Sequence, residues 1–336
     1  KLEVEQKVPL QVNGELFKFN QWFELNYQVN DFKYIKEYKQ KFKTKTEKRY
    51  LNWVAENRLF INDLNDVCVE EIVFQDVVGL PSMLQKNSTS LSLKESLVFH
   101  SSFDELRNEF TYARYLIFQA SEIKEESKHF YNKTYPHTDD TLHAIDNLKT
   151  SHMKSAFRIL YSLFDKISYF IAKYLNLPIK DNQISFKGIF FGKSNKIHTS
   201  LESSNNFFLH ALFYILIEFE KDSLDADDVY LNRKMHRLAI IRNFIEHRSF
   251  RVVDDFGYKI NTEFNVYHSN KYKELLAQRD ELEKKSQNNT VEYEKILEEI
   301  KNKETRSKYI LEMPISEFDD SLMLLVRLLR NSLMYL

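Results

Sequence analysis

The sequence predicts an all-α protein in which several long helices pack into one bundle. Glycine and proline are scarce, with 5 of each among 336 residues, so few tight turns or helix breaks are expected. Apolar residues recur at spacings of three and four through several long segments, which is the pattern of helices with one buried face. The motifs G-x-x-x-x-G-K-[ST] and G-x-G-x-x-G do not occur, which argues against a P-loop or dinucleotide-binding fold.

Residues 1–50 differ from the rest of the chain and are predicted to form an N-terminal arm or linker. Between Val8 and Phe19, short apolar and polar runs flank Asn13-Gly14, a dipeptide typical of two-residue β-hairpin turns. An aromatic, lysine-rich stretch follows and ends near Tyr50. We therefore expect a small β-hairpin in this arm and the start of the helical domain at residue 51.

Beyond residue 50 the pattern predicts helices separated by short connections. A serine-rich stretch between Leu80 and Ser96 predicts a loop. Helical spacing of apolar residues predicts, in chain order, helices over 103–128, 152–177, 206–220, from 230 onward, and 316–336. Alternating residues between Arg251 and Tyr267 predict a short β segment.

The predicted helix 152–177 is apolar on more than one side, so we expect it at the centre of the core. It contains the neighbours Asp165 and Lys166 within this apolar run. A buried ion pair is the favoured interpretation of these two residues, ahead of a catalytic role.

Residues 268–308 are predicted to be an insertion that forms a charged helical hairpin. Two highly charged helical patterns, 271–285 and 291–308, are separated by a polar break at 286–290. Apolar residues on the two helices are expected to face each other: Leu275, Leu276 and Leu282 on the first, and Val291, Ile296, Leu297 and Ile300 on the second. A structural arm or a partner contact is the favoured role.

The candidate site lies on the helix that begins near Tyr230, in the stretch Arg242-Asn243-Phe244-Ile245-Glu246-His247. An imidazole can take the proton of a ribose 2′-hydroxyl or give one to the departing 5′-oxygen. A guanidinium can neutralise the charge that develops on the phosphoryl oxygens. Arg242 and His247 are therefore candidate catalytic residues, Asn243 a positioning residue, and Glu246 a supporting residue. The alternative is a surface ion pair between Arg242 and Glu246.

The stretch is placed on its helix by an apolar stripe formed by Leu231, Leu238, Ile241 and Ile245. Arg242 and His247 are five residues apart, which separates them by roughly 140° around a helix axis and about 7.5 Å along it. One helix therefore does not bring them together neatly. We expect a second copy of the helix, packed across a dimer axis, to complete a shared cleft.

Several basic residues surround the candidate site. The formal net charge is −1, so any attraction for nucleic acid must be local. Candidate RNA-binding residues on either side of the motif are Arg233, Lys234, His236, Arg237, Arg248 and Arg251. A solvated helix face explains these residues equally well.

The remaining features restrict the compartment and the cofactors. The single cysteine, Cys68, cannot form an intramolecular disulfide, and neither a secretory signal nor an apolar run long enough for a membrane span is present. His137 and His143 lie beside two aspartates, but their spacing matches no familiar metal motif. We expect a cytoplasmic protein without membrane contact, metal or other cofactor. A start at Lys1 is also consistent with a preceding domain.

The chain resembles the HEPN superfamily of helical ribonuclease domains, in which an Arg, often followed by a polar residue, precedes a His by a short spacing. Within it, the sequence is most similar to the LA2681-like HEPN family. The resemblance covers roughly residues 51–336. Beside the Arg-Asn-Phe-Ile-Glu-His stretch, it rests on the segments NRLFINDLND (57–66), FTYARYL (110–116), FRILYSLFDKI (157–167) and RNSLMYL (330–336).

This resemblance implies a HEPN-type helical bundle and a metal-independent endoribonuclease. Such an enzyme leaves a 2′,3′-cyclic phosphate and a 5′-hydroxyl, with Arg242, Asn243 and His247 in the site. It further implies a homodimer formed through this domain and a prokaryotic toxin or antiviral defence effector, held inactive by a regulatory partner or upstream domain. The competing hypothesis is a non-catalytic RNA-binding or dimerisation module that regulates an attached or partner protein.

Overall fold

The computed structural model describes residues 10–12, 15–17, 39–81, 85–86, 89–90, 92–124, 129–134, 143–191, 197, 205–219, 233–285, 290–307 and 310–336. The chain divides into two compact units, Lys1–Val77 and Val78–Leu336. None of the helices in the described ranges combines the length and the hydropathy that crossing a membrane would need.

In the described part of the first unit, a capped α-helix is the longest element. In chain order this unit contains β1 (Leu10–Val12), β2 (Glu15–Phe17), α3 (Lys45–Glu56) and the 3₁₀ helices Asp63–Asp66 and Glu71–Val73. Strands β1 and β2 pair antiparallel, in the segment where the sequence predicts a hairpin. Helix α3 begins at a capping box formed by Thr44 and Glu47. Position 50, where the sequence predicts the domain boundary, lies inside α3.

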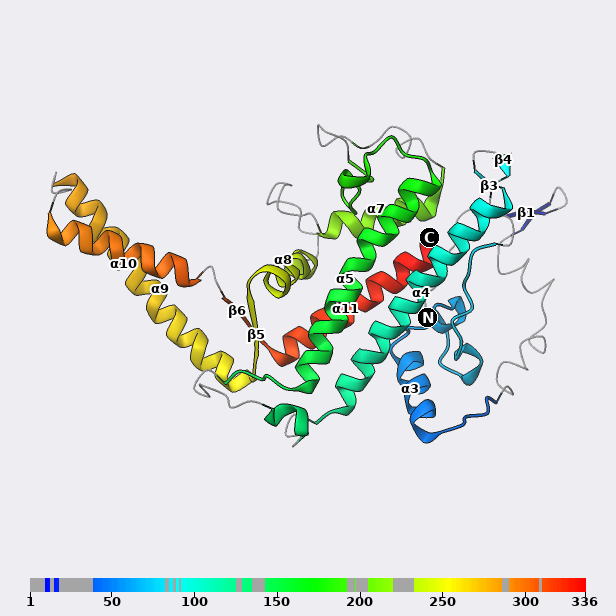
Figure 1. The fold of residues 1–336 in the computed structure, drawn as a ribbon, viewed down its shortest axis with the longest axis horizontal. Coiled ribbons are helices and arrows are strands. Elements are labelled where there is room, and N and C mark those ends of the chain that lie inside the picture. The colour runs from blue at the N-terminus through cyan, green and yellow to red at the C-terminus, as the bar shows by residue number, and fades with distance from the viewer. Residues whose placement is uncertain are drawn as a thin grey trace. The chain divides into compact units, whose positions relative to one another are not determined.

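The second unit is mostly helical (Figure 1). In chain order it contains β3 (Gln85–Lys86), β4 (Thr89–Ser90), α4 (Leu93–Glu122), a 3₁₀ helix (Phe130–Lys133), α5 (Leu148–Tyr174), a 3₁₀ helix (Asp181–Gln183), α7 (Phe207–Phe219), α8 (Arg233–His247), β5 (Ser249–Val253), α9 (Asp255–Lys284), α10 (Val291–Ser307), β6 (Ile310–Pro314) and α11 (Ile315–Tyr335).

Helix α5 lies at the centre of this unit, as the sequence predicts. It contacts α4, α8 and α11, and Figure 1 shows it between α4 and α8. Its inward side chains Phe157, Leu160, Leu163 and Ile167 are fully buried. Burial of one such side chain stabilises a fold by about 1.5–3 kcal/mol, so α5 holds the bundle together.

Helix α4 begins earlier than the sequence predicts, at Leu93 instead of near 103. The serine-rich stretch that is predicted to be a loop contains the start of this helix. The Glu95 N–H donates a hydrogen bond to the Ser92 hydroxyl, and the Ser92 N–H donates one to the Glu95 carboxylate. The capping box at Asn147 and Thr150 starts α5 in the same way. Serine content alone therefore does not distinguish a loop from a helix cap.

The small sheet of this unit is parallel and joins two segments far apart in the sequence. Strand β5 pairs with β6 so that Ser249 lies opposite Ile310 and Val253 opposite Pro314. The prediction of a β segment over 251–267 was wrong beyond Val253, because the Asp254 side chain caps a helix that begins at Asp255. Parallel strands need a long crossover, and here α9 and α10 provide it.

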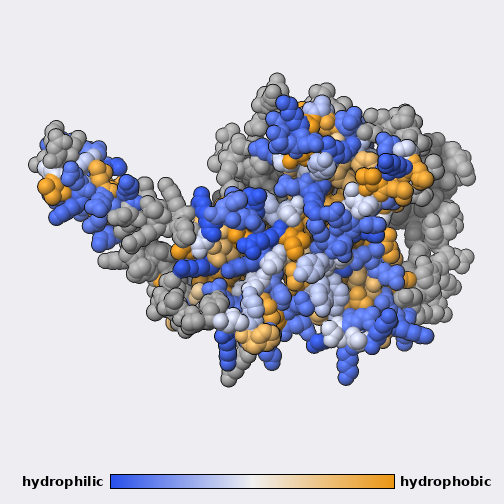
Figure 2. Space-filling model, viewed as in Figure 1, coloured by the Kyte–Doolittle hydropathy of each residue, from blue (hydrophilic) through white to orange (hydrophobic). Residues whose placement is uncertain are grey.

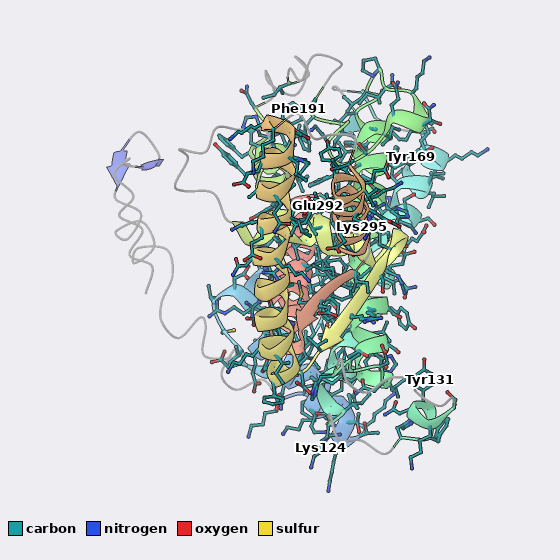
Figure 3. All side chains as sticks on the ribbon, turned by 90° about the vertical axis from the view of Figure 1, so that its left-hand side faces the viewer. Lys124, Tyr131, Tyr169, Phe191, Glu292 and Lys295 are labelled. Carbon is teal, nitrogen blue, oxygen red and sulfur yellow. The ribbon has the colours of Figure 1, made fainter. Side chains whose placement is uncertain are left out.

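Helices α9 and α10 form the predicted hairpin and lie side by side in Figures 1 and 3. Their contact buries Leu275, Ile296 and Ile300. Of the apolar residues expected in this contact, Val291 and Leu297 are instead exposed. Glu292 and Lys295, which Figure 3 labels, are among the exposed charged residues of α10. The hairpin therefore has a narrow apolar seam and a broad polar surface.

Candidate functional site

Helix α8 carries the predicted motif and is oriented by its apolar stripe. Leu238, Ile241 and Ile245 are buried, whereas Asn243 and His247 are exposed. Leu231, the first residue of the predicted stripe, lies outside the described residues. Figure 2 shows a mainly hydrophilic surface over α8. Burial of one face thus turns the motif towards α5 and solvent.

A pocket of about 370 Å³ lies where α5 and α8 meet. The side chains that line it are Arg158, Ile159, Tyr161, Ser162 and Asp165 from α5, and Arg242, Glu246 and His247 from α8. Arg242 and His247 therefore face one pocket within a single chain. The neighbouring helix α5 supplies the opposite wall of this pocket, and completion of the site by a second copy of the helix stays a prediction.

The Arg242 side chain is held by two neighbours. Its Nη1 donates a hydrogen bond to Oδ1 of Asn243 at 3.1 Å. Its guanidinium lies over the Tyr161 ring, 5.7 Å from the ring centroid, which is a cation–π distance. Asn243 and Tyr161 thus orient the guanidinium, and its remaining N–H groups are the donors that the site can offer to an anion.

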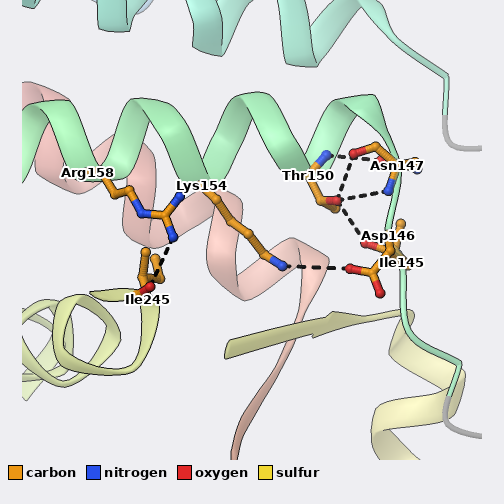
Figure 4. A network of polar contacts seen from close by, with 7 residues as sticks. All are labelled: Ile145, Asp146, Asn147, Thr150, Lys154, Arg158 and Ile245. Atoms are coloured by element: carbon orange, nitrogen blue, oxygen red, sulfur yellow. Dashed lines mark hydrogen bonds and ion pairs between the residues drawn. The ribbon is translucent and has the colours of Figure 1, made fainter. Parts of the chain in front are cut away.

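Glu246 pairs with α5, not with Arg242 as the surface ion-pair alternative requires. Its Oε1 lies 3.3 Å from Nε of Arg158, and Nη2 of Arg158 also donates to the Ile245 carbonyl oxygen at 3.0 Å (Figure 4). That carbonyl belongs to the last turn of α8, where no further helical N–H is available. Both side chains of the ion pair are well exposed, so the charge attraction contributes at most about 1 kcal/mol. Arg158 mainly fastens the motif-bearing end of α8 to α5.

Asp165 and Lys166 do not form the buried pair predicted from the sequence. Because they are adjacent on a helix, they point in different directions. Lys166 Nζ lies 2.6 Å from a carboxylate oxygen of Glu105 and also contacts Glu109, both on α4. Asp165 is exposed and lines the pocket. Asp165 was missed as a site residue. It shares one face of α5 with Arg158 and Tyr161, but this spacing does not show that α8 packs beside that face.

The pocket changes the acidity of Asp165. Desolvation by the surrounding protein raises the pKa of this carboxyl, although part of the side chain remains exposed. The positive charge of Arg242 and a hydrogen bond from the Phe186 main chain act in the opposite direction. The net rise in pKa makes the Asp165 carboxylate a stronger base than a freely solvated one.

The predicted RNA-binding residues have different surroundings. Arg237 contacts Glu317, and Nη1 of Arg251 lies 3.9 Å from Oε1 of Glu312. Arg248 is exposed, with its guanidinium 5.0 Å from the centroid of the Phe244 ring. The side chains of Arg233, Lys234 and His236 lie outside the described part of α8.

The weaker metal candidate has another explanation. Nδ1 of His143 lies 3.3 Å from Oδ2 of Asp254, the residue that caps α9, and His137 lies outside the described residues. Over the ranges that the structure describes, no three His, Cys, Asp or Glu side chains gather in a way that would hold a metal ion.

A mostly helical unit with an Arg-Asn-x-x-x-His stretch facing a pocket has the features of a HEPN domain. Residues 90–289 match the family model described as LA2681-like HEPN. The chain belongs to this family, as its resemblance predicted. The matched range is narrower than 51–336 but includes α5 and α8, and therefore every residue that lines the pocket. Comparisons with curated proteins and with solved structures gave no match.

Proposed function

We propose that this protein is an endoribonuclease that cleaves RNA without a metal ion, through attack of a ribose 2′-hydroxyl on the adjacent phosphate. The observation that carries the proposal is the pocket between α5 and α8, in which Arg242 and His247 face the same space. Membership of the HEPN family, which includes many ribonucleases, supports it. The products would be a 2′,3′-cyclic phosphate and a 5′-hydroxyl.

The proposed roles follow from the chemistry of the side chains. Arg242 binds the scissile phosphate and stabilises the charge that grows on its oxygens during attack. His247, at the end of α8, transfers a proton to or from the reacting oxygens. Asn243 keeps the Arg242 guanidinium in place through their hydrogen bond. Glu246 has a supporting role, since its contact with Arg158 links α8 to α5.

Neighbouring basic residues extend the proposed RNA path. Arg248, directly after His247, is exposed and suited to an adjacent phosphate. Arg233, Lys234 and His236 are proposed for the other side, one to three turns before Arg242. Arg237 and Arg251, also proposed to bind RNA, would each first have to release a nearby glutamate.

We further propose a homodimer through the HEPN domain and a defence or toxin role under control of a partner or attached domain.

The test is cleavage of a mixed-sequence RNA by the purified chain in the presence of a chelator. We expect fragments with cyclic phosphate ends and no cleavage of the same RNA carrying 2′-O-methyl groups, because the methyl group removes the nucleophile. Arg242→Ala and His247→Ala should each abolish most of the activity. Arg327→Ala, an exposed arginine on α11, and His129→Ala, outside the pocket, are the matched controls.

Two outcomes would reject the proposal. Equal cleavage by wild type and His247→Ala would assign the activity to a contaminant or to another site. RNA binding with no cleavage in any activated state would instead favour the non-catalytic binding or dimerisation module.

A further inference from the structure

The pocket contains a carboxylate that the Arg242–His247 motif does not include. Asp165 lies on α5, one helical turn beyond Tyr161 and Ser162, and all three line the pocket. Its sequence neighbour Lys166 is directed to α4, where Glu105 and Glu109 engage it. Asp165 is thereby separated from the cation next to it in the chain and faces the groups on α8.

Asp165 shares the pocket with a small set of charged and titratable side chains. They are Arg158 and Tyr161 from α5, and Arg242, Glu246 and His247 from α8. The segment after α5 adds a hydrogen bond from the Phe186 main chain to the Asp165 carboxyl. Arg242 is the cation whose charge acts on Asp165, whereas Glu246 is already occupied by Arg158 at 3.3 Å.

The proposed reaction needs two proton transfers, and they make opposite demands. A base must remove the 2′-hydroxyl proton, and an acid must protonate the departing 5′-oxygen. The described pocket lining has a single imidazole, that of His247, which cannot be deprotonated for the first task and protonated for the second at once. A second titratable group in the pocket would allow both proton transfers to be assisted by the protein.

We propose that Asp165 is this second group and acts as the general base. The inference rests on the proposed ribonuclease function. The Asp165 carboxylate takes the 2′-hydroxyl proton, and the 2′-oxygen forms a bond to phosphorus. The bond between phosphorus and the 5′-oxygen breaks with its electron pair remaining on that oxygen, which receives a proton from the His247 imidazolium. Arg242 stabilises the phosphoryl oxygens throughout.

The raised pKa of Asp165 agrees with its role as the base. Partial desolvation raises the pKa of Asp165 above its ordinary value of 3.8, which strengthens the carboxylate as a base. Asp165 remains deprotonated near neutral pH only while its pKa stays below that pH, and the charge of Arg242 helps to keep it there. Arg242 can bind the phosphate while the Asp165 carboxylate removes the proton of the neighbouring 2′-hydroxyl.

The experiment compares Asp165→Asn, Asp165→Glu and the control Asp319→Asn under single-turnover conditions. Asp319 is a carboxyl on α11 whose pKa desolvation also raises, but it does not line the pocket. We expect Asp165→Asn to slow cleavage by about 10²–10⁴-fold. Asp165→Glu should recover part of the rate, and Asp319→Asn should match wild type. Circular dichroism and thermal melting establish that each variant is folded.

Binding and pH dependence distinguish a base from a structural carboxylate. Because Asp165 is negative and close to Arg242, Asp165→Asn should bind a 2′-O-methyl RNA at least as tightly as wild type while cleaving unmodified RNA slowly. The wild-type rate should rise with pH as Asp165 loses its proton. The Asp165→Asn variant should lose the rising, acidic part of this profile.

The outcomes separate this inference from the function on which it rests. If wild type cleaves RNA and Asp165→Asn cleaves equally fast with an unchanged pH profile, Asp165 is not the base, while the ribonuclease proposal stands. A slower Asp165→Asn whose binding weakens in proportion and whose pH profile is unchanged would also overturn the inference. A wild type that binds RNA and never cleaves it overturns both.

Discussion

The α5–α8 pair and the α9–α10 hairpin are both two-helix contacts rich in charged residues, yet they differ in how those charges are placed. On the hairpin, Arg279 pairs with Asp280 at 2.6 Å and lies 3.7 Å from Glu283, so its partners are neighbours on its own helix. In the pocket, Arg242 from α8 faces Tyr161 and Asp165 from α5. On the hairpin, the charge of Arg279 is compensated within its own helix and stays on a solvated surface, whereas the charged residues of α5 and α8 line one pocket.

Substitutions in the α5–α8 pocket and on the α9–α10 hairpin are expected to differ most in their effect on the cleavage rate. Arg242→Ala and His247→Ala should each reduce the single-turnover rate by about 10²–10⁴-fold, because each removes a group that acts in the transition state. The double variant should lose little more than the worse single variant, since the two groups act as one unit. Arg279→Ala on the hairpin should retain the wild-type rate. A hairpin variant as inactive as Arg242→Ala would remove the contrast between the two regions.

The same contrast predicts different contributions to stability. Leu163→Ala in the fully buried centre of α5 should lower the free energy of unfolding by about 2–5 kcal/mol. Ile296→Ala in the narrow hairpin seam should cost less, because fewer neighbours surround the cavity and water reaches it more readily. Urea unfolding followed by circular dichroism gives both values. Equal losses would mean that the hairpin is as much a part of the core as α5.

A smaller effect is expected at the link between α5 and α8. Arg158→Met removes the hydrogen bond to the Ile245 carbonyl and should lower the free energy of unfolding by about 1 kcal/mol. The cleavage rate of the folded variant should also fall, because the end of α8 that carries the motif loses its hydrogen bond to α5. A double-mutant cycle with Glu246→Gln should give a coupling below about 1 kcal/mol, as the ion pair is exposed. Unchanged cleavage by a folded Arg158→Met would show that α8 holds its position without this anchor.

The smallest effect concerns pH. Desolvation lowers the pKa of His152 on α5 below its ordinary value of 6.5, so the folded state binds this proton less readily than the unfolded state. The resulting stability is complete above pH 6.5 and is lost as the pH falls through the lowered pKa. His152→Gln should therefore lose less stability than wild type between pH 7 and 5, measured by thermal melting. A variant that follows the wild-type curve, or a His129→Gln control that also flattens it, would contradict this assignment.

Several helices and part of the candidate site can be predicted from local patterns in the sequence. The spacing of apolar residues located α5, α8, α11 and the α9–α10 hairpin, because a helix needs one apolar face wherever it packs. The grouping of Arg242, Asn243 and His247 on one helix was equally visible. Starts were predicted less well, since Ser92 reads as a loop residue unless its reciprocal contact with Glu95 is recognised.

Other features depend on which helix meets which. The sequence by itself determined that α8 buries Leu238 and Ile241 and turns Arg242 and His247 away from the core. Only the tertiary structure decided that Asp165 joins them, that Lys166 turns to α4, and that β5 pairs with β6. The physical reason is that the spacing of apolar residues shows which face of a helix is buried. Which helix packs beside its polar face depends on distant chain segments, and the local sequence does not specify it.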